Sequence, residues 1–367
     1  YNFSYATSKK AFADKYIVRQ AMLRNPTEPV YDTEGKTPIS GGYYYNSGPF
    51  EYYNPVAMIN EMDDKGNIKE FSGSINASFQ IIEPLKINAL ASLIETSERF
   101  GHYYGRYYPV NFGYNGTAEV YNDHSKQKLF ETNFDFNKQF NDHKLQAIAG
   151  YSYSEESYEQ YFASNYKFDT DLYSFHNIGS GAALADGKAS MSSKKESNKL
   201  IAFLCRVMYN YKERYLLSAS LRYEGSSRFG KNNKWGKFPA VSVGWRLSEE
   251  AFMKDIKWID NVKLRAGFGV TGNQNIGNYK SLQVLSKGAN FYYNNSWTST
   301  YYPASNPNPD LKWEKKEEFN IGLDLSVLDN RLSATIDYYN RRTKDLLYTY
   351  TVPVPPNLYH SKFTNVG

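Results

Sequence analysis

The sequence predicts an all-β protein whose antiparallel strands form part of a transmembrane β-barrel. Three observations lead to this prediction: long strands with one apolar face, tight turns that alternate with long connections, and the lack of any long apolar run. About eleven strands are expected, at approximately 1–9, 71–82, 85–97, 128–140, 143–157, 199–211, 215–224, 237–247, 262–272, 316–328 and 332–338.

The clearest strand pair runs from Lys199 to Phe229, where residue type alternates with a period of two on both sides of the turn Lys212-Glu213-Arg214. Each run is about a dozen residues long, against roughly 5 to 6 in soluble proteins. Each apolar face ends in tyrosines, which suits lipid bounded by an aromatic girdle, and the polar face suits a wet lumen. The residues assigned to lipid are Ile201, Phe203, Cys205, Val207, Tyr209 and Tyr211, then Tyr215, Leu217, Ala219, Leu221 and Tyr223.

The other strands repeat this alternation. The apolar faces are Phe71, Ile75, Ala77, Phe79 and Ile81 in 71–82, Phe130, Phe134, Phe136 and Phe140 in 128–140, and Phe319, Ile321, Leu323, Leu325 and Val327 in 316–328. Weaker versions cover 1–9, 85–97, 143–157, 237–247 and 262–272.

The connections are of two kinds. Ile82-Glu83-Pro84, Asn141-Asp142-His143, Lys212-Glu213-Arg214 and Asp329-Asn330 are tight, whereas about 10–70, 98–127, 158–196 and 273–315 are long. Followed strand by strand, every tight turn falls on one side, as expected for a transmembrane barrel. The exceptions are a short outer loop at Gly230 to Gly236 and an inner connection at about 248–261, which predicts a Ser-capped helical turn.

Composition excludes other classes of protein. No segment approaches the ~18 consecutive apolar residues of a membrane helix. The formal net charge of +5 is mild for 367 residues, and without a dense Lys/Arg run it gives no reason to expect a nucleic-acid partner. The single cysteine, Cys205, cannot form an internal disulfide and is interpreted as a small apolar side chain facing lipid.

Both ends of the sequence are interpreted as cuts through a longer protein. The first residues, YNFSYATSK, already have the pattern of a strand, and another strand begins near Asn365-Val366-Gly367. The missing signal peptide therefore carries no weight against export.

Four blocks of sequence resemble the barrel of SusC/RagA-type TonB-dependent outer-membrane transporters. They are RVMYNYKERYLLSASLRYEGSSRFG, WGKFPAVSVGWRLSEEAF, VKLRAGFGVTGNQNIGNY and NPNPDLKWEKKEEFNIGLDLSVLDNRLSATIDYYNRRTKDLLY, in this order. They cover about Lys199 to Tyr348, and upstream Ala21 to Thr27 and Tyr53-Asn54-Pro55 fit the family's large outer loop.

This resemblance implies a 22-stranded barrel in the outer membrane of a Gram-negative cell. It also implies an N-terminal plug opened by TonB–ExbB–ExbD with the energy of the proton gradient, and a SusD-like surface lipoprotein that serves as a lid. Members of the family import glycans or peptides too large for porins. The chain departs from the family pattern because it lacks the plug and about half of the strands, so residues 1–367 are expected to form a partial barrel.

Two helical segments are expected outside the strands. In the outer loop at about 10–70, the run Ser8 to Asn25 has near-helical apolar spacing and is stopped by Asn25-Pro26. It could contact the lipoprotein lid, or it could pack within the loop. The inner connection at about 248–261 holds the other segment.

Clusters of aromatic residues in the predicted outer loops are candidates for substrate binding, because flat rings provide contact area with little loss of entropy. The candidates are Tyr43, Tyr44, Tyr45, Tyr103, Tyr104, Tyr107, Tyr292, Tyr293 and Trp297, near which lie Tyr52, Tyr53 and Tyr108. For any single residue the competing interpretation is an aromatic girdle or packing within a loop. The hypothesis is therefore collective: some of these rings contact substrate.

No catalytic, metal or cofactor site is predicted. The histidines His102, His124, His143, His176 and His360 lack metal-ligand spacing, and Asp63 to Asn67 is interpreted as a plain turn before a strand. Carboxylates at lumen positions, namely Glu131, Asp135, Glu318, Asp324 and Asp337, are explained as lining of a wet lumen.

Three functions are compatible with the sequence: active transport, a β-rich surface glycan-binding protein without transport activity, and a β-rich glycosidase. The last is disfavoured because no carboxylate motif is recognisable. The long strands and the sorting of turns by side favour the first over the second. The sequence does not distinguish a glycan cargo from a peptide, although aromatic and Asn-rich loops suit sugars.

Overall fold

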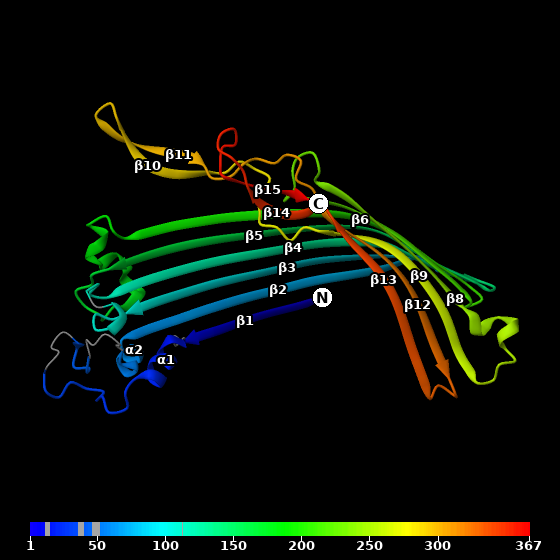
Figure 1. Cartoon of the computed structure of the whole chain (residues 1–367), viewed down its shortest axis with the longest axis horizontal. Coiled ribbons are helices and arrows are strands. Elements are labelled where there is room, and N and C mark those ends of the chain that lie inside the picture. Colours follow the sequence, from blue (N-terminus) through cyan, green and yellow to red (C-terminus); the bar gives the residue numbers. More distant parts are fainter. Residues whose placement is uncertain (12–14, 36–39, 46–51, 112) are drawn as a thin grey trace.

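Eleven antiparallel strands form one curved, open sheet in the computed structural model, which describes all residues except 12–14, 36–39, 46–51 and 112 (Figure 1). The strands are β1 (Asn2–Ala11), β2 (Met62–Ile82), β3 (Leu85–Tyr104), β4 (Thr117–Phe140), β5 (His143–Tyr166), β6 (Ser190–Tyr211), β7 (Tyr215–Ser226), β8 (Trp235–Arg246), β9 (Ile259–Asn273), β12 (Glu314–Val327) and β13 (Leu332–Lys344). They pair in chain order, with β12 beside β9. The predicted all-β fold and its eleven strands are confirmed.

The strands differ in length more than the sequence predicts. β2 to β6 have 20 to 24 residues, whereas β7, β8, β9, β12 and β13 have 12 to 15. The predicted bounds of the long connections at 98–127 and 158–196 are wrong, since only 105–116 and 167–189 lie outside the strands. The apolar and polar alternation fades in these upper segments, although the backbone pairing continues.

The predicted tight turns are confirmed, and antiparallel order places all four at one end of the sheet (Figure 1). Asn141, Lys212 and Glu213 have φ between 52 and 53°, a left-handed conformation found in short hairpin turns. The long connections lie at the opposite end. In a transmembrane barrel the short turns face the periplasm and the long loops face outward, so we call these the inner and outer ends.

The inner connection between β8 and β9 contains two short 3₁₀ helices, η5 (Leu247–Glu249) and η6 (Ala251–Met253). The predicted serine cap is wrong, because Ser248 lies inside η5 and its hydroxyl donates to Asn261 Oδ1 (3.5 Å). Glu250 holds the connection instead. Its carboxylate accepts hydrogen bonds from the Tyr215 hydroxyl (2.6 Å) and Trp245 Nε1 (2.9 Å), and these bonds lower the pKa of Glu250.

The large outer loop holds two helices, α1 (Lys15–Leu23) and α2 (Pro55–Asn60). The predicted helical run from Ser8 starts too early, because β1 continues to Ala11 through its pairing with β2. Asn54 caps α2 with its side-chain oxygen. Ile17 of α1, Met58 of α2 and Tyr108 form a buried cluster, so the loop packs on itself.

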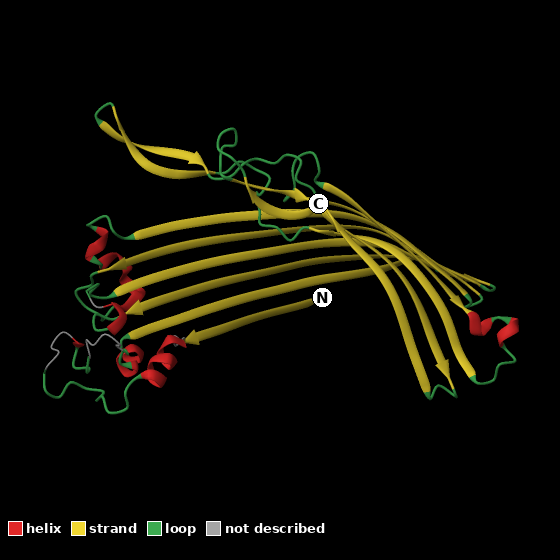
Figure 2. Cartoon of the chain, in the orientation of Figure 1, coloured by secondary structure: helices red, strands yellow, loops and turns green. Residues whose placement is uncertain are grey.

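A second set of outer segments forms a lobe above β6 to β9, which we call the outer lobe. It contains two hairpins, β10 (Leu285–Tyr293) with β11 (Ser296–Pro303) and β14 (Leu346–Thr351) with β15 (Ser361–Val366) (Figure 2). The sequence predicted only a strand beginning near Asn365-Val366-Gly367, whereas β15 ends at Val366 and lies outside the eleven-stranded sheet. Its buried cluster is Phe229, Phe238, Ile276, Leu311 and Trp313.

Asparagine side chains tie the outer lobe together. Asn306 Nδ2 donates to the carbonyls of Tyr359 (2.6 Å) and Ser361 (2.8 Å), and Asn308 Nδ2 donates to that of Phe363 (3.0 Å). Residue 230 must be glycine, since an added Cβ would lie 2.1 Å from the Pro309 carbonyl oxygen.

The third buried cluster also lies at the outer end, where Tyr103, Ala118, Phe168 and Phe175 meet. Phe175 belongs to the 3₁₀ helix η3 (Ser174–Ser180), which is followed by η4 (Ala182–Leu184); a third short helix, η2 (Pro109–Asn111), lies in the preceding outer loop. Among the described residues, no helix is both long and apolar enough to cross a bilayer.

Candidate functional site

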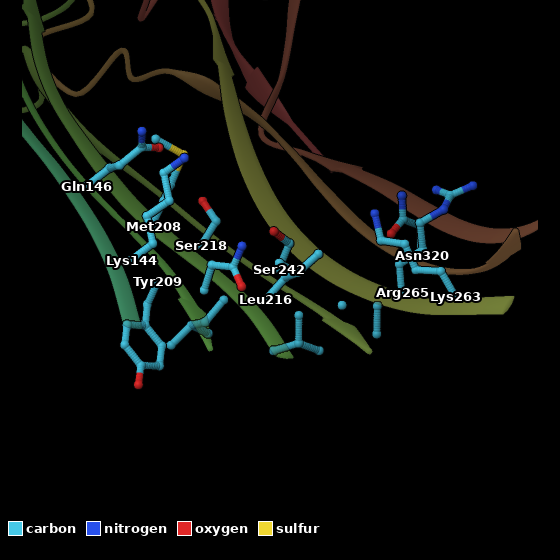
Figure 3. Close-up of a pocket in the computed structure, with 15 residues that line it drawn as sticks. Lys144, Gln146, Met208, Tyr209, Leu216, Ser218, Ser242, Lys263, Arg265 and Asn320 are labelled. Atoms are coloured by element: carbon cyan, nitrogen blue, oxygen red, sulfur yellow. The ribbon is translucent and has the colours of Figure 1, made fainter. Parts of the chain in front are cut away.

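The hydrogen-bonded register sorts the strand side chains onto two faces, because paired residues of neighbouring strands point to the same side of a sheet. One row runs Phe79, Ile87, Phe134, Ala149, Cys205 and Leu221, and a row of the other face runs Gln146, Met208, Ser218, Ser242, Gly267 and Asn320. Figure 3 shows Gln146 and Met208 on one side of the strands and Tyr209 on the other. The predicted faces are therefore confirmed, with Cys205 on the apolar one.

Two aromatic bands edge the apolar, outward face. The outer girdle is Phe130, Tyr151, Phe203, Tyr223 and Trp235, and the inner girdle is Phe140, His143, Tyr211, Tyr215 and Trp245; neighbouring rings in both lie 4.7 to 6.5 Å apart. From Phe203 to Tyr211 on β6 the distance is about 26 Å along the strand, or roughly 20 Å along the membrane normal at the usual tilt. This approaches the ~25 Å apolar band of transmembrane barrels.

Above the outer girdle, the inward face of β3 to β6 carries a wall of aromatic, carboxylate and amide side chains. We define this inner wall by four rows: Phe100, Tyr121 and Phe162; Glu98, Asp123, Gln160 and Lys194; Ser125, Tyr158 and Glu196; Gln127, Glu156 and Asn198. The rings of Tyr121 and Phe162 lie 4.8 Å apart. Side chains of this kind can bind sugar faces or peptide groups by stacking and hydrogen bonding.

Hydrogen bonds fix the polar groups of the inner wall. Asp123 accepts from the Tyr158 hydroxyl (3.2 Å) and from Gln160 Nε2 (3.0 Å). Glu156 accepts from Asn198 Nδ2 (3.1 Å). The wall therefore presents acceptors in defined positions, and carboxylates so placed retain free lone pairs for the hydroxyl or amide donors of a ligand.

The outer lobe closes over the lower part of this wall. Arg228, in the loop between β7 and β8, pairs with Glu156 (3.5 Å) and donates through Nε to Asn278 Oδ1 (3.2 Å). Arg228 and Asn278 line a hollow of about 210 Å³ together with Tyr158 and Glu196. The hollow is small, so it provides a subsite on a larger surface.

Charge is sorted by face in the strand segments above the outer girdle, which are 62–73, 93–104, 117–128, 155–166 and 190–199. Their inward face carries seven carboxylates and one lysine, namely Asp64, Glu70, Glu98, Glu119, Asp123, Glu156 and Glu196 with Lys194. Their outward face carries seven cations and four carboxylates, namely Lys65, Lys69, Arg99, Lys126, Lys128, Lys195 and Lys199 with Asp63, Glu95, Glu155 and Glu159. An acidic inner face disfavours anionic ligands.

Below the outer girdle the inward face remains polar and forms a hollow of about 480 Å³ (Figure 3). Arg265 is within reach of two carboxylates there, Asp324 (3.2 Å) and Asp337 (2.7 Å). The carboxylates predicted to line the lumen, namely Glu131, Asp135, Glu318, Asp324 and Asp337, all occupy inward register positions. Inward polar residues of β4 and β5, such as Glu131 and Ser152, connect the inner wall with this lower region, whereas β6 presents Leu200, Ala202 and Leu204 there.

The predicted aromatic residues of the large outer loop lie within packed structure. Tyr43 stacks on Tyr31 (5.8 Å between centroids), and the Arg24 guanidinium lies 5.9 Å from the Tyr44 ring. Tyr45 is half-buried. Tyr53 packs against the cluster of Ile17, Met58 and Tyr108, and its neighbour Tyr52 is half-buried.

The second predicted group lies at the outer ends of β3 and the following loop. Tyr103 is only 3% exposed and donates to Asp171 Oδ1 (2.7 Å), whereas Tyr104 lies beside Tyr108 (4.7 Å between centroids). Tyr107 lies under the Arg106 guanidinium (5.7 Å). Arg106 also pairs with Asp171 (2.9 Å).

This arrangement affects Glu61, at the end of α2. Burial and the nearby Asp171 carboxylate raise the pKa of Glu61 above its ordinary value. The outer end therefore contains a carboxyl group whose protonated form is favoured by folding.

The third predicted group is open to solvent. Tyr292, Tyr293 and Trp297, on the β10–β11 hairpin, are 53%, 69% and 70% exposed. Tyr292 and Trp297 pair across the strands with ring centroids 5.1 Å apart. The hairpin projects from the outer lobe (Figure 1).

Sequence reasoning missed the inner wall because it assigned 98–127 and 158–196 to loops. The sequence gives no clear signal there, because both faces of Glu98 to Tyr104 are polar or aromatic and no apolar and polar alternation marks the strand. The Asp63 to Asn67 prediction is also wrong, since these residues lie inside β2, where Asp64 pairs with His102 (2.8 Å).

Three of the five histidines belong to strands of the sheet and have side-chain partners. His102 pairs with Asp64, His124 with Glu95 (3.2 Å), and His143 lies 2.6 Å from the Tyr209 hydroxyl. In the part of the chain that the structure describes, no group of three or more His, Cys, Asp or Glu side chains is arranged to hold a metal ion.

Comparisons with known proteins agree with this architecture. Residues 12–367 match the family described as "TonB dependent receptor-like, beta-barrel". The chain is 30% identical to the TonB-dependent receptor SusC of Bacteroides thetaiotaomicron, over 100% of this chain and 38% of the relative. It is 37% identical to a TonB-dependent receptor of Formosa agariphila, over 65% of this chain and 22% of the relative.

A solved structure, described as the RagAB peptide transporter, matches with a TM-score of 0.78 at 24% identity and covers 89% of this chain and 35% of that one. This similarity concerns the fold. The chain spans well under half the length of the curated relatives it matches.

Proposed function

Because the chain belongs to the TonB-dependent receptor β-barrel family, we propose that the intact protein is a SusC-type importer that carries oligosaccharides or peptides across the outer membrane. Energy would come through TonB–ExbB–ExbD acting on a plug domain, and a SusD-like lipoprotein would cover the outer mouth. The SusC relative and the RagAB match support this assignment by family and by fold.

The inner wall is the observation that supports import of a large polar nutrient. It lies above the outer girdle, faces the lumen, and joins the polar surface around Arg265 through inward polar residues of β4, β5 and β7, beside the apolar inward residues of β6. A ligand held there would be positioned at the entrance of the transport path. Neighbouring aromatic rings beside fixed carboxylates and amides suit cargo with many hydroxyl or amide groups.

Seven inward carboxylates restrict the proposed cargo further. They accept hydrogen bonds and attract positive charge, so neutral glycans and neutral or basic peptides fit, whereas anionic glycans and acidic peptides do not. The RagAB protein is described as a peptide transporter, which supports a peptide as much as the aromatic rows support a glycan.

The predicted outer-loop aromatics are a second proposed contact zone. The exposed hairpin residues Tyr292, Tyr293 and Trp297 are best placed for it, because their rings are free to meet a ligand or the lid. Tyr43, Tyr44, Tyr45, Tyr103, Tyr104 and Tyr107 would act chiefly by holding the surrounding loops.

Neighbouring residues on opposite faces of β5 provide a matched test. In the intact receptor, Phe162→Ala removes an inward ring of the inner wall, and Tyr161→Ala removes an outward ring one residue away. We expect Phe162→Ala to weaken binding of the responsive member of a panel of neutral oligosaccharides and tryptic peptides about tenfold, measured by calorimetry. Tyr161→Ala should leave the affinity unchanged. Equal affinities for both variants and the wild type would contradict the proposed site.

The alternative function is surface binding of glycans without transport. If this alternative is correct, collapse of the proton gradient leaves the amount of ligand associated with the cells unchanged. If the protein is an importer, collapse of the gradient leaves ligand bound at the outer surface and stops its entry. An intact protein that dissolved in buffer without detergent would also contradict a membrane barrel.

A further inference from the structure

The outward face of β4 to β6 carries a compact lysine patch directly above the outer girdle. In register order its rows are Lys128, Glu155 and Lys199; Lys126, Ser157 and Ser197; His124, Glu159 and Lys195. We propose that this patch binds the phosphate groups of lipid A, the anionic glycolipid of the outer leaflet. The proposal concerns the lipid-facing surface, so it is independent of the cargo.

The patch lies at the height of lipid headgroups. The row directly below Lys128 and Lys199 is Phe130, Tyr153 and Ile201, which borders the apolar band. In β2 to β6, four consecutive outward rows from this level toward the inner end contain no charged residue. Lysines just above such a band direct their ammonium groups toward the headgroup layer.

The size of the patch suits one headgroup. Three adjacent strands span about 10 Å, and three outward rows span about 13 Å along the strands. Four lysines fall within this area, namely Lys126, Lys128, Lys195 and Lys199. Several ammonium groups can therefore meet one phosphorylated sugar headgroup at the same time.

Carboxylates in the patch and on the neighbouring strand β3 orient the lysines without neutralising the face. Lys128 pairs with Glu155 (3.6 Å), Lys126 with Glu95 (3.8 Å), and Lys195 with Glu159. An ammonium group has three donors, so each paired lysine keeps donors for a phosphate oxygen. Lys199 lies opposite Glu155 in the same row, and among the described residues no carboxylate oxygen lies within 4.0 Å of its ammonium group.

The opposite face of the same strand segments shows that the positive charge is specific to the lipid side. The outward face has an excess of three cations, and the inward face has an excess of six carboxylates. Charge on strand residues beyond the membrane is thus arranged by face: acceptors toward the lumen and cations toward the leaflet. Lysines near a membrane surface attract anionic headgroups.

The test uses the intact, detergent-purified receptor and vesicles containing lipid A. Lys128→Gln with Lys199→Gln should weaken binding roughly tenfold, measured as the lipid retained per receptor by native mass spectrometry. A matched control, Lys254→Gln with Lys257→Gln, removes two exposed lysines of the inner connection. The control should retain lipid A like the wild type.

Two further measurements use the wild type and so do not depend on how a variant folds. Lipid A stripped of its phosphates should bind the wild type roughly tenfold more weakly than intact lipid A, and millimolar inorganic phosphate should not displace intact lipid A. Equal retention of stripped and intact lipid A would overturn the proposal. So would equal retention by the double variant, or displacement by free phosphate, which would indicate a site for the free anion.

Discussion

Above the membrane, the outer segments of the two halves of the sheet are ordered in different ways. β2 to β6 continue as paired strands well beyond the outer girdle, whereas β7, β8, β9, β12 and β13 stop near it. Above the short strands lies the outer lobe, with its own buried cluster around Trp313. The long half thus exposes a two-faced sheet, and the short half is covered by a compact core.

This difference shows that lipid determines only part of each strand. Between the girdles, the bilayer requires one apolar face in both halves, and the same alternation appears in β5 and β7. Beyond the girdle, backbone pairing no longer depends on apolar residues, so the long strands can carry aromatic rings and carboxylates on one face and cations on the other. The short half needs side-chain packing and asparagine hydrogen bonds to order its outer segments.

The largest effect should come from the core of the outer lobe. Trp313 is 2% exposed, packs against Phe229 and Phe238, and donates through Nε1 to the Lys234 carbonyl (3.0 Å). Trp313→Ala should lower the local stability of the lobe by about 3 to 5 kcal/mol, measured by hydrogen exchange of 274–284 and 305–313 in the intact receptor. β4 and β5 should keep their protection.

Trp297→Ala is the control for this prediction, because Trp297 is 70% exposed on the β10–β11 hairpin. The same substitution there should change protection by less than about 0.5 kcal/mol. If Trp313→Ala destabilised the long strands as much as the lobe, the two halves would not be independent above the membrane.

The second-largest effect tests the apolar outward face, which both halves of the sheet share within the lipid. Ala149 lies on the outward face between Phe134 and Cys205, and its neighbour Ile148 lies on the inward face between Asp135 and Arg206. Ala149→Arg should lower the free energy of unfolding by about 2 to 4 kcal/mol, whereas Ile148→Arg should cost about 1 kcal/mol or less. Urea unfolding of the receptor in lipid vesicles measures both values, and equal costs would contradict the assignment of faces.

The sequence predicts the fold well wherever lipid acts on it. The parity of Phe203, Cys205 and Val207 is visible without a structure, because only one face of each strand meets an apolar solvent. The same reasoning fails at Glu98 to Tyr104, where both faces are polar or aromatic and no periodic contrast marks the strand. The sequence therefore predicts that the strands end at the edge of the lipid-facing band, whereas β2 to β6 continue beyond it.

The inner wall falls in that unmarked region, so the sequence did not predict it. Tyr121 and Phe162 are far apart in the chain and become neighbours through the register of β4 and β5, which cannot be deduced from either segment alone. The exposed aromatics Tyr292 and Trp297 were identified because clustered rings in a loop are visible in the sequence. Their hairpin pairing was not.

The smallest expected effect is a difference between the two ends of the sheet in how their local stability depends on pH. At the outer end, burial and Asp171 raise the pKa of Glu61 above 4.5, so folding stabilises its protonated form. That stabilisation is fully present below 4.5 and is lost as the pH rises through the higher pKa of the folded state. Hydrogen exchange of 105–111, corrected for intrinsic rates, should show greater protection at pH 4 than at pH 7, and Glu61→Gln should remove the difference.

The inner end should respond in the opposite direction. Hydrogen bonds from Tyr215 and Trp245, with the charge of Arg214, lower the pKa of Glu250 below 4.5, so the connection gains stability that is present above 4.5 and is lost as the pH falls through the lower pKa of the folded state. Protection of 247–258 should therefore decrease on acidification, and Glu250→Gln should make it independent of pH. If both ends lost protection together, the response would come from the whole sheet. Opposite responses would show that each end of the strands is held by its own carboxylate, because Glu61 is half-buried near another carboxylate and Glu250 is surrounded by donors.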